Sequence, residues 1–158
     1  MAEIPVEEYL CTRIRRTEQA LMGHHEAVLR RHGLTMTQYT VLLVLVREGG
    51  MSGAQLARAC GVTQQTMATV LTGLQNKNLI TREPSPVHAK VMIANQTAAG
   101  RELLDRAYQE VIVLERALTD AFTPAEHAAF CELLERATAI LIEQTPRSSS
   151  ASGTKPAT

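Results

Sequence analysis

The sequence lacks tryptophan, and aromatic residues make up only 3% of it. Its hydrophobic residues nevertheless amount to 45%, well above the level of disordered chains, so a packed core is expected. With so few aromatic residues, that core must consist mostly of Leu, Val, Ile and Ala. The 158 residues are enough for one domain, or for one domain with arms.

The sequence also lacks a net charge, because 16 basic residues balance 16 acidic ones. The overall charge of a strongly basic chain would steer it towards nucleic acid, and here that contribution is absent. The balance does not exclude nucleic-acid binding, because a local basic patch can serve the same purpose. Charge alone therefore leaves the class of partner open.

Bonding and targeting patterns are missing as well. Cys11, Cys60 and Cys131 have no CxxC spacing, and an odd number of cysteines makes a poor disulfide framework. No apolar run approaches the ~20 residues of a membrane span. The first ten residues, MAEIPVEEYL, are acidic and unlike a signal peptide. These absences predict a cytoplasmic protein in a reducing compartment that does not contact a membrane.

Capping signals divide the chain into helices. An apolar stripe with steps of three and four residues predicts one long helix from Val6 to about Arg31, ended by Gly33. Thr63 caps a helix that is expected to end near Asn78. Three capping boxes start further helices: Thr35 with Gln38, Ser52 with Gln55, and Thr123 with Glu126.

Residues 79–96 predict a β-hairpin, because LITREP and VMIANQ have the composition of strands and SPVHAK has that of a turn. Two long helices follow, over about 97–122 and 124–144. Residues 146–158 have no apolar anchor and are predicted to be a disordered tail. The expected fold class is mainly α with a small β-hairpin wing.

Eighteen consecutive residues between Arg58 and Lys77, ACGVTQQTMATVLTGLQN, carry no charge. On a helical wheel their apolar stripe consists of Met67, Val70, Leu71 and Leu74. The free face shows Gln and Thr, where an ordinary surface helix would carry Lys and Glu. Gln can pair with adenine and Thr can reach several base edges, so such a face suits the major groove of DNA. The alternative is a solvated, threonine-rich helix that happens to lack charge.

The neighbouring elements favour DNA binding. A capped helix, a glycine turn, a second helix and then a β-hairpin form the winged helix-turn-helix arrangement. With these elements in order, the sequence resembles the MarR family of transcriptional regulators over nearly all of residues 6–144. The segments that carry the resemblance are HGLTMTQYTVLLVL, SGAQLARACGVTQQTMATVLTGLQNKNLITR and HAKVMIANQTAAGRELL.

The resemblance implies a homodimer that binds a pseudo-palindromic operator in double-stranded DNA, usually as a repressor. The implied parts are a dimerisation helix (1–34), a winged region (35–97) with its recognition helix at about 63–78 and its wing at about 79–96, and C-terminal dimerisation helices (98–145). Carried over by position, DNA contacts are implied for Thr63, Gln64, Gln65, Thr66 and Thr69 on the recognition helix, for Ser52 and Arg82 near phosphates, and for Lys90 on the wing.

The wing departs from the family pattern. His88 stands where the family commonly has Asp, Lys90 replaces an Arg, and Gln96 replaces the Leu before Thr97. Asp at that place usually orders the wing by pairing with a basic residue, and neutral histidine would not, so we expect a looser wing. A charged His88 would contact phosphate; a plain exposed histidine is the alternative.

Members of this family often release DNA when a small phenolic or aromatic anion binds between the dimerisation helices and the winged region. Arg15, Met22, His24, His25 and Tyr39 are the candidates for lining such an effector site. The alternative places His24 in the dimer core and leaves Arg15 solvated.

Cys11 suggests a different switch, in which oxidation of the repressor releases the DNA. It has the same offset before LTMTQY as the sensing cysteine in the organic-hydroperoxide-sensing branch, and Arg15, one turn on, could favour a thiolate. That branch holds its thiolate with tyrosines, whereas Arg15 and His25 stand at the matching places here, so an incidental cysteine is the alternative. Cys60 and Cys131 are expected to be small core residues.

Functions of other classes were weighed as well. A helical protein-interaction module without DNA readout would suit the zero net charge, but the Gln/Thr face lacks the aromatic anchors of protein-binding helices. An enzyme is not expected, because no nucleophile–base pair, phosphate loop or carboxylate pair stands in a meaningful context. No cofactor is expected, and no metal site either, since adjacent His24 and His25 point about 100° apart on a helix.

Overall fold

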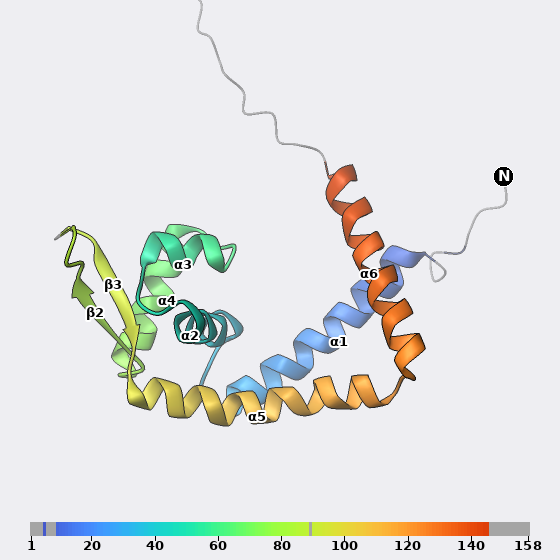
Figure 1. The fold of residues 1–158 in the computed structure, drawn as a ribbon, viewed down its shortest axis with the longest axis horizontal. Coiled ribbons are helices and arrows are strands. Elements are labelled where there is room, and N and C mark those ends of the chain that lie inside the picture. Colours follow the sequence, from blue (N-terminus) through green and yellow to red (C-terminus); the bar gives the residue numbers. More distant parts are fainter. Residues whose placement is uncertain (1–4, 6–8, 89, 146–158) are drawn as a thin grey trace, which may run out of the picture. The chain divides into compact units, whose positions relative to one another are not determined.

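A computed structural model of the chain describes residues 5, 9–88 and 90–145. They form two compact units, Met1–Leu114 and Glu115–Thr158. The elements in order are α1 (Leu10–Arg31), α2 (Met36–Glu48), β1 (Met51–Ser52), α3 (Gly53–Ala59), α4 (Gln64–Asn76), β2 (Ile80–Pro84), β3 (Met92–Gln96), α5 (Ala98–Asp120) and α6 (Pro124–Gln144). Figure 1 labels all of them except β1. The predicted fold class is confirmed. The predicted disordered tail, residues 146–158, lies outside the described residues.

The helices begin where the capping residues predicted. Each of the three capping boxes has both of its hydrogen bonds, and the Thr63 side chain accepts a hydrogen bond from the Thr66 amide at the start of α4. The bonds from Thr123 also lower the pKa of Glu126. Only α1 differs, because it begins at Leu10 after an extended Tyr9; the predicted start at Val6 lies outside the described residues.

Three helices end in the same way, with a residue in the left-handed region. Gly33 follows α1, Gly61 follows α3 and Asn78 follows α4, with φ values of 66°, 64° and 57°. In each case the next amide reaches back over five residues, as in the 3.0 Å bond from the Leu79 N–H to the Leu74 carbonyl. This is the Schellman motif. It ends α4 at Asn76, two residues before the predicted end.

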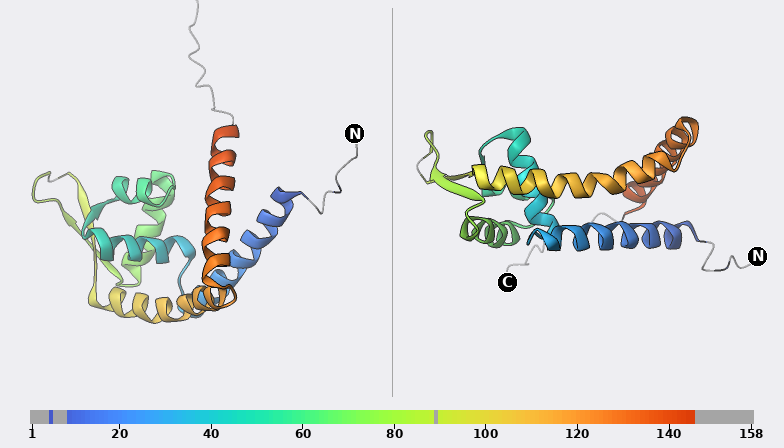
Figure 2. Two further views of the ribbon diagram at one scale, coloured as in Figure 1. Left: turned by 45° about the vertical axis from the view of Figure 1, so that its right-hand side comes forward. Right: turned by 90° about the horizontal axis from the view of Figure 1, so that it is seen from below.

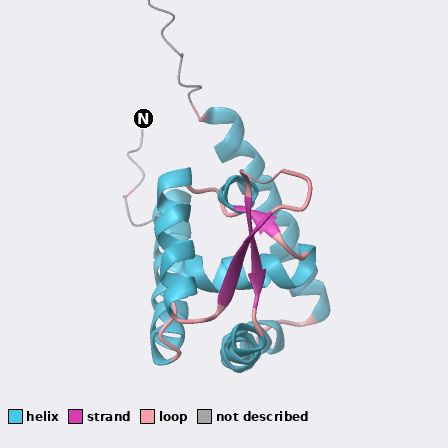
Figure 3. Ribbon diagram, turned by 90° about the vertical axis from the view of Figure 1, so that its left-hand side faces the viewer, coloured by secondary structure: helices cyan, strands magenta, loops and turns pink. Residues whose placement is uncertain are grey.

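The sheet has three antiparallel strands in the order β1-β3-β2 (Figure 3). The predicted hairpin is present, with β2 and β3 in register from Ile80 opposite Gln96 to Pro84 opposite Met92. Strand β1, which places Met51 opposite Ala94, was not predicted from the sequence. A strand of two residues is too short to show the alternation by which strands are recognised.

The core of the unit Met1–Leu114 is aliphatic, as predicted. It joins the end of α1, α2, α3, α4, the hairpin and the first half of α5, and its largest fully buried side chains are Leu, Val, Ile and Met: Leu29, Val41, Leu42, Leu56, Met67, Leu71, Leu74 and Ile80. Tyr39 is the single aromatic residue among its buried members in the described part of the chain. No helix of the described residues is long and apolar enough to span a membrane.

The described residues of the unit Glu115–Thr158 form no comparable core. No described residue of α6 is buried, and the helix exposes six large apolar side chains: Phe130, Leu133, Leu134, Ile140, Leu141 and Ile142. Cys131 is exposed too, so the prediction that it is a core residue is wrong. Cys60, in the other unit, is partly buried, and this burial raises its pKa.

A hydrogen-bonded junction joins the hairpin to α5. The Thr97 hydroxyl donates to the Asn78 carbonyl (2.8 Å) and accepts from the Gly100 amide (3.0 Å), so it caps α5. The Thr97 amide donates to the Leu79 carbonyl at 3.1 Å. The first turn of α5 therefore lies directly against the chain that leaves α4.

Gln96 is poorly accommodated beside this junction. Both polar atoms of its side-chain amide are buried and have no hydrogen-bond partner among the described residues. A buried polar group without a partner costs about 1–3 kcal/mol. We predict that Gln96→Leu raises the free energy of unfolding by about that amount, measured by urea denaturation. Gln75→Leu, at an exposed position of α4, is the control and should change little. An unchanged midpoint for Gln96→Leu would contradict the prediction.

Candidate nucleic-acid interface

One face of α4 is buried and the other is open to solvent. Met67, Leu71 and Leu74 are at most 1% exposed and pack into the core. Because these three side chains set the rotation of the helix about its axis, Gln64, Gln65 and the threonines are turned outward, and all are exposed. The structure thus gathers the predicted recognition residues on one accessible surface.

The polar groups of this surface differ in what they can still bind. Thr63 and Thr66 hydroxyls lie 2.9 Å apart, and the Thr69 hydroxyl donates to the Gln65 carbonyl at 3.3 Å. The threonines therefore use their hydroxyl protons mainly within the helix and keep an acceptor and a methyl group for a partner. The side-chain amides of Gln64 and Gln65 make no hydrogen bond to any other described residue. Each has a donor and an acceptor available for a base edge.

The predicted phosphate contacts are less exposed. Ser52 is half-buried, and its hydroxyl donates to Gln55 Oε1 at 2.7 Å as part of the capping box of α3. Arg82 is half-buried on β2. Ser52 is thus engaged in capping α3, and its proposed contact with phosphate stays a prediction.

The wing extends away from the helices of the winged region (Figure 2). His88 and Lys90 are exposed near its tip, and Ala89 between them lies outside the described residues. The turn is held by Ser85: its amide donates to the Val91 carbonyl (2.7 Å), and its hydroxyl accepts from the amides of Val87 and His88 (3.3 Å each). This role of Ser85 was not predicted from the sequence, although a Ser-Pro pair favours the start of a turn.

The five predicted effector residues lie on α1 and α2 and differ in their exposure. Arg15 and His24 are exposed on α1, Met22 and His25 are half-buried there, and Tyr39 is buried on α2. Burial, and secondly Tyr108, raise the pKa of Tyr39.

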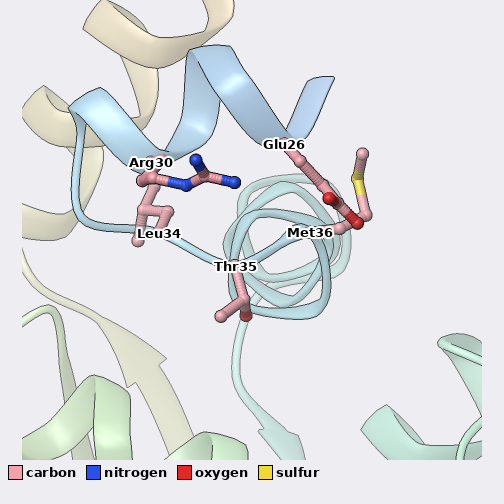
Figure 4. A pocket seen from close by; sticks show the side chains of 5 residues that line it. All are labelled: Glu26, Arg30, Leu34, Thr35 and Met36. Carbon is pink, nitrogen blue, oxygen red and sulfur yellow. The ribbon is translucent and has the colours of Figure 1, made fainter. Parts of the chain in front are cut away.

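A hollow in this unit has a volume of about 280 Å³ and is lined by other residues: Glu26, Arg30, Leu34, Thr35 and Met36 (Figure 4). The effector site therefore stays a prediction.

Cys11 lies exposed in the first turn of α1. Arg15, one turn further, is exposed as well. Exposure makes the thiol accessible to an oxidant. Its role in redox sensing stays a prediction.

Known proteins resemble this chain in both sequence and fold. The MarR family model matches residues 32–90. An HTH-type transcriptional repressor of Mycobacterium tuberculosis is 33% identical over 110 residues, which cover 70% of this chain and 79% of that protein. Homoprotocatechuate degradative operon repressor of Escherichia coli is 25% identical over 118 residues, covering 74% and 79%.

Two solved structures share the fold. BpsR of Bordetella bronchiseptica, whose DNA binding is regulated by 6-hydroxynicotinic acid, has a TM-score of 0.74 and 21% identity, covering 87% of this chain and 98% of that one. The repressor CouR, of Rhodococcus jostii, bound to a 23-mer DNA duplex, has a TM-score of 0.73 and 23% identity, covering 87% and 99%.

Proposed function

Because this chain belongs to the MarR family and is a transcriptional repressor of that family, we propose that it acts as a homodimer that releases a pseudo-palindromic operator when it binds a small aromatic acid. The observation that carries the DNA readout is the exposed face of α4, with the unpaired amides of Gln64 and Gln65 in its first turn. The N-terminal residues of a recognition helix make the base contacts in this class of domain.

The second protomer is proposed to cover α6. A soluble protein rarely leaves a stripe of large apolar side chains open, and such a stripe marks an interface. Five of the six exposed residues, all but Ile142, recur at steps of three, four and seven along one face of the helix, as in helices that pair with one another. A two-fold dimer would present two copies of α4 to half-sites about 10 bp apart.

The proposed effector is an aromatic carboxylate or phenolate. The regulation of BpsR by 6-hydroxynicotinic acid and the binding of p-coumaroyl-CoA by CouR support this class of ligand. Arg15 would supply positive charge, and Met22, His24, His25 and Tyr39 the remaining wall. Release through oxidation of Cys11 is the alternative, and a chain without DNA readout is the alternative of another class.

The test of the DNA readout is fluorescence anisotropy with DNA from upstream of the protein's own gene and with scrambled DNA, across a salt series. Gln64→Ala and Gln65→Ala are each expected to weaken operator binding by about 1–3 kcal/mol and to leave binding to scrambled DNA nearly unchanged, because an amide that reads a base is lost. Gln75→Ala, exposed near the other end of α4, is the matched control.

Equal losses on both DNAs for the Gln64 and Gln65 variants would contradict their role in base readout. Weak and equal binding of both DNAs by the wild-type protein would instead favour the protein-interaction function. A wild-type protein that prefers the operator, with a steep dependence on salt, would support the repressor function.

A further inference from the structure

We propose that Lys77 is a positioning residue: it fixes the C-terminal end of α4 to the turn between α1 and α2, and so sets the orientation of the recognition helix without touching DNA. The inference rests on the proposed function of α4 in DNA readout. Lys77 follows the last residue of α4. Its ammonium group donates to the Gly33 carbonyl and, at 3.2 Å, to Gln38 Oε1.

The Gly33 carbonyl is well placed to accept this bond. In the turn that ends α1, the amides of Gly33 and Leu34 bond back to the helix at 3.0 Å each, and the positive φ of Gly33 turns its own carbonyl out of the helix. The C-terminal end of a helix also carries partial negative charge, which favours a cation. A neutral side chain at position 77 would lose both contributions.

Gln38 provides the second acceptor from a rigid position. It is the only buried polar residue in the described part of the chain. Its Oε1 also accepts a hydrogen bond from the Thr35 amide at 3.2 Å. A Cβ added at Gly73 would lie 3.0 Å from Gln38 Nε2, so α4 approaches this amide closely. Gln38 therefore contacts α4 in its last turn and at the capping lysine.

The turn is held on its other side by α5. His32 Nε2 lies 3.0 Å from Glu110 Oε1, and Arg31 pairs with the other oxygen of the same carboxylate. All of these residues belong to the unit Met1–Leu114. Residues 31–38 thus form a fixed point between α5 and the end of α4, and Lys77 is the side chain that joins α4 to it.

This fixed point lies at the opposite end of α4 from Gln64, so a small tilt of the helix there would move Gln64 by a larger distance. Gln64 and Lys77 are separated by the length of α4, roughly 20 Å at 1.5 Å per residue. A tilt of about 5° at the fixed end would displace Gln64 by roughly 1.7 Å. A displacement of that size is enough to break a bidentate pair with a base, because hydrogen bonds weaken steeply with distance and angle.

The competing role for Lys77 is a direct contact with phosphate, and Lys90 provides the matched comparison. These are the two lysines of the described residues, and the wing lysine is the one proposed to contact DNA. Operator and scrambled DNA are titrated with Lys77→Met and Lys90→Met over a salt series. Lys77→Met is expected to lower operator affinity about ten-fold with an unchanged salt slope and little change on scrambled DNA.

Lys90→Met is expected to weaken binding to both DNAs equally and to lower the salt slope by about one. Lys77→Arg should restore operator affinity, because its guanidinium can donate to both acceptors. If Lys77→Met weakened binding to operator and scrambled DNA equally and lowered the salt slope by about one, Lys77 would be a phosphate contact. That result would overturn the proposal. Unchanged operator affinity would overturn it too.

Hydrogen exchange tests the contact without DNA. Lys77→Met should speed exchange of the amides at the end of α4 and in residues 33–35 about ten-fold, whereas Lys90→Met should not. Unchanged exchange would overturn the proposal whatever the DNA titrations give. If the wild-type protein shows no operator preference, the proposed function fails, and exchange alone decides whether Lys77 holds α4.

Discussion

Gly100→Ala is expected to lower the free energy of unfolding by at least about 3 kcal/mol. A Cβ at this position would lie 2.1 Å from the Leu79 carbonyl oxygen and 3.0 Å from the Leu79 carbonyl carbon. These are backbone atoms, so no side-chain rotation can relieve the overlap. Either the first turn of α5 or the start of the hairpin must move.

Neither segment moves freely. The Leu79 carbonyl accepts from the Thr97 amide at 3.1 Å, and the Thr97 hydroxyl holds the Asn78 carbonyl at 2.8 Å. Moving α5 away from Leu79 would stretch both bonds and open the core around Leu104, which is 3% exposed. The substitution is therefore expected to break the hydrogen bonds of this junction, because a small local shift cannot accommodate the added Cβ.

The measurement is urea denaturation at a fixed protein concentration, because the stability of an oligomer depends on concentration. Gly23→Ala is the matched control, since Gly23 also lies inside a helix but has no atom within 4 Å of the added Cβ. It should gain about 0.5–1 kcal/mol from helix propensity. If Gly100→Ala gained stability as Gly23→Ala does, the close approach of α5 to Leu79 would be refuted.

The predictions that succeeded rest on short-range interactions. A capping box joins residues three apart, so Thr35 with Gln38 or Thr123 with Glu126 can be recognised directly in the sequence. The stripe of Met67, Leu71 and Leu74 predicted the buried face of α4 in the same way. Given that face, the exposed position of Gln64 and Gln65 followed.

The features that the sequence did not predict depend on distant residues. Lys77 meets Gly33 across 44 positions, and β1 exists only because β3 lies beside it. No local sequence pattern predicts either contact. Cys131 was expected in a core, but no described residue of α6 is buried: its neighbour Phe130 stacks on Phe122 and is still 44% exposed.

The candidate effector site is also a feature that depends on distant residues. Arg15, Met22, His24 and His25 come from α1, and Tyr39 comes from α2, so their meeting depends on packing rather than on spacing. The hollow that is present uses Arg30 and Met36, which lie close to the turn between the same two helices. A family resemblance transfers positions along the chain, whereas the shape of a hollow depends on each side chain around it.

Leu141→Glu is expected to dissociate the proposed dimer and with it to abolish tight operator binding. Leu141 is 48% exposed on α6, in line with Phe130, Leu134 and the half-buried Ala137. In a two-fold interface each substitution occurs twice, so two carboxylates would enter an apolar contact without partners. Burying unpaired charge costs several kcal/mol per group, so the substitution favours separate protomers.

Loss of the dimer should weaken operator binding by two to four orders of magnitude, because each half-site is then bound separately. Sedimentation velocity measures the oligomeric state, and anisotropy on the same samples measures operator binding. Ala139→Glu places the same charge on the opposite, exposed face of α6 and should leave both unchanged. A Leu141→Glu protein that still sediments as a dimer would remove α6 from the interface. The exposed stripe would then need another partner, since Leu133, Ile140 and Leu141 are each about half-exposed among the described residues.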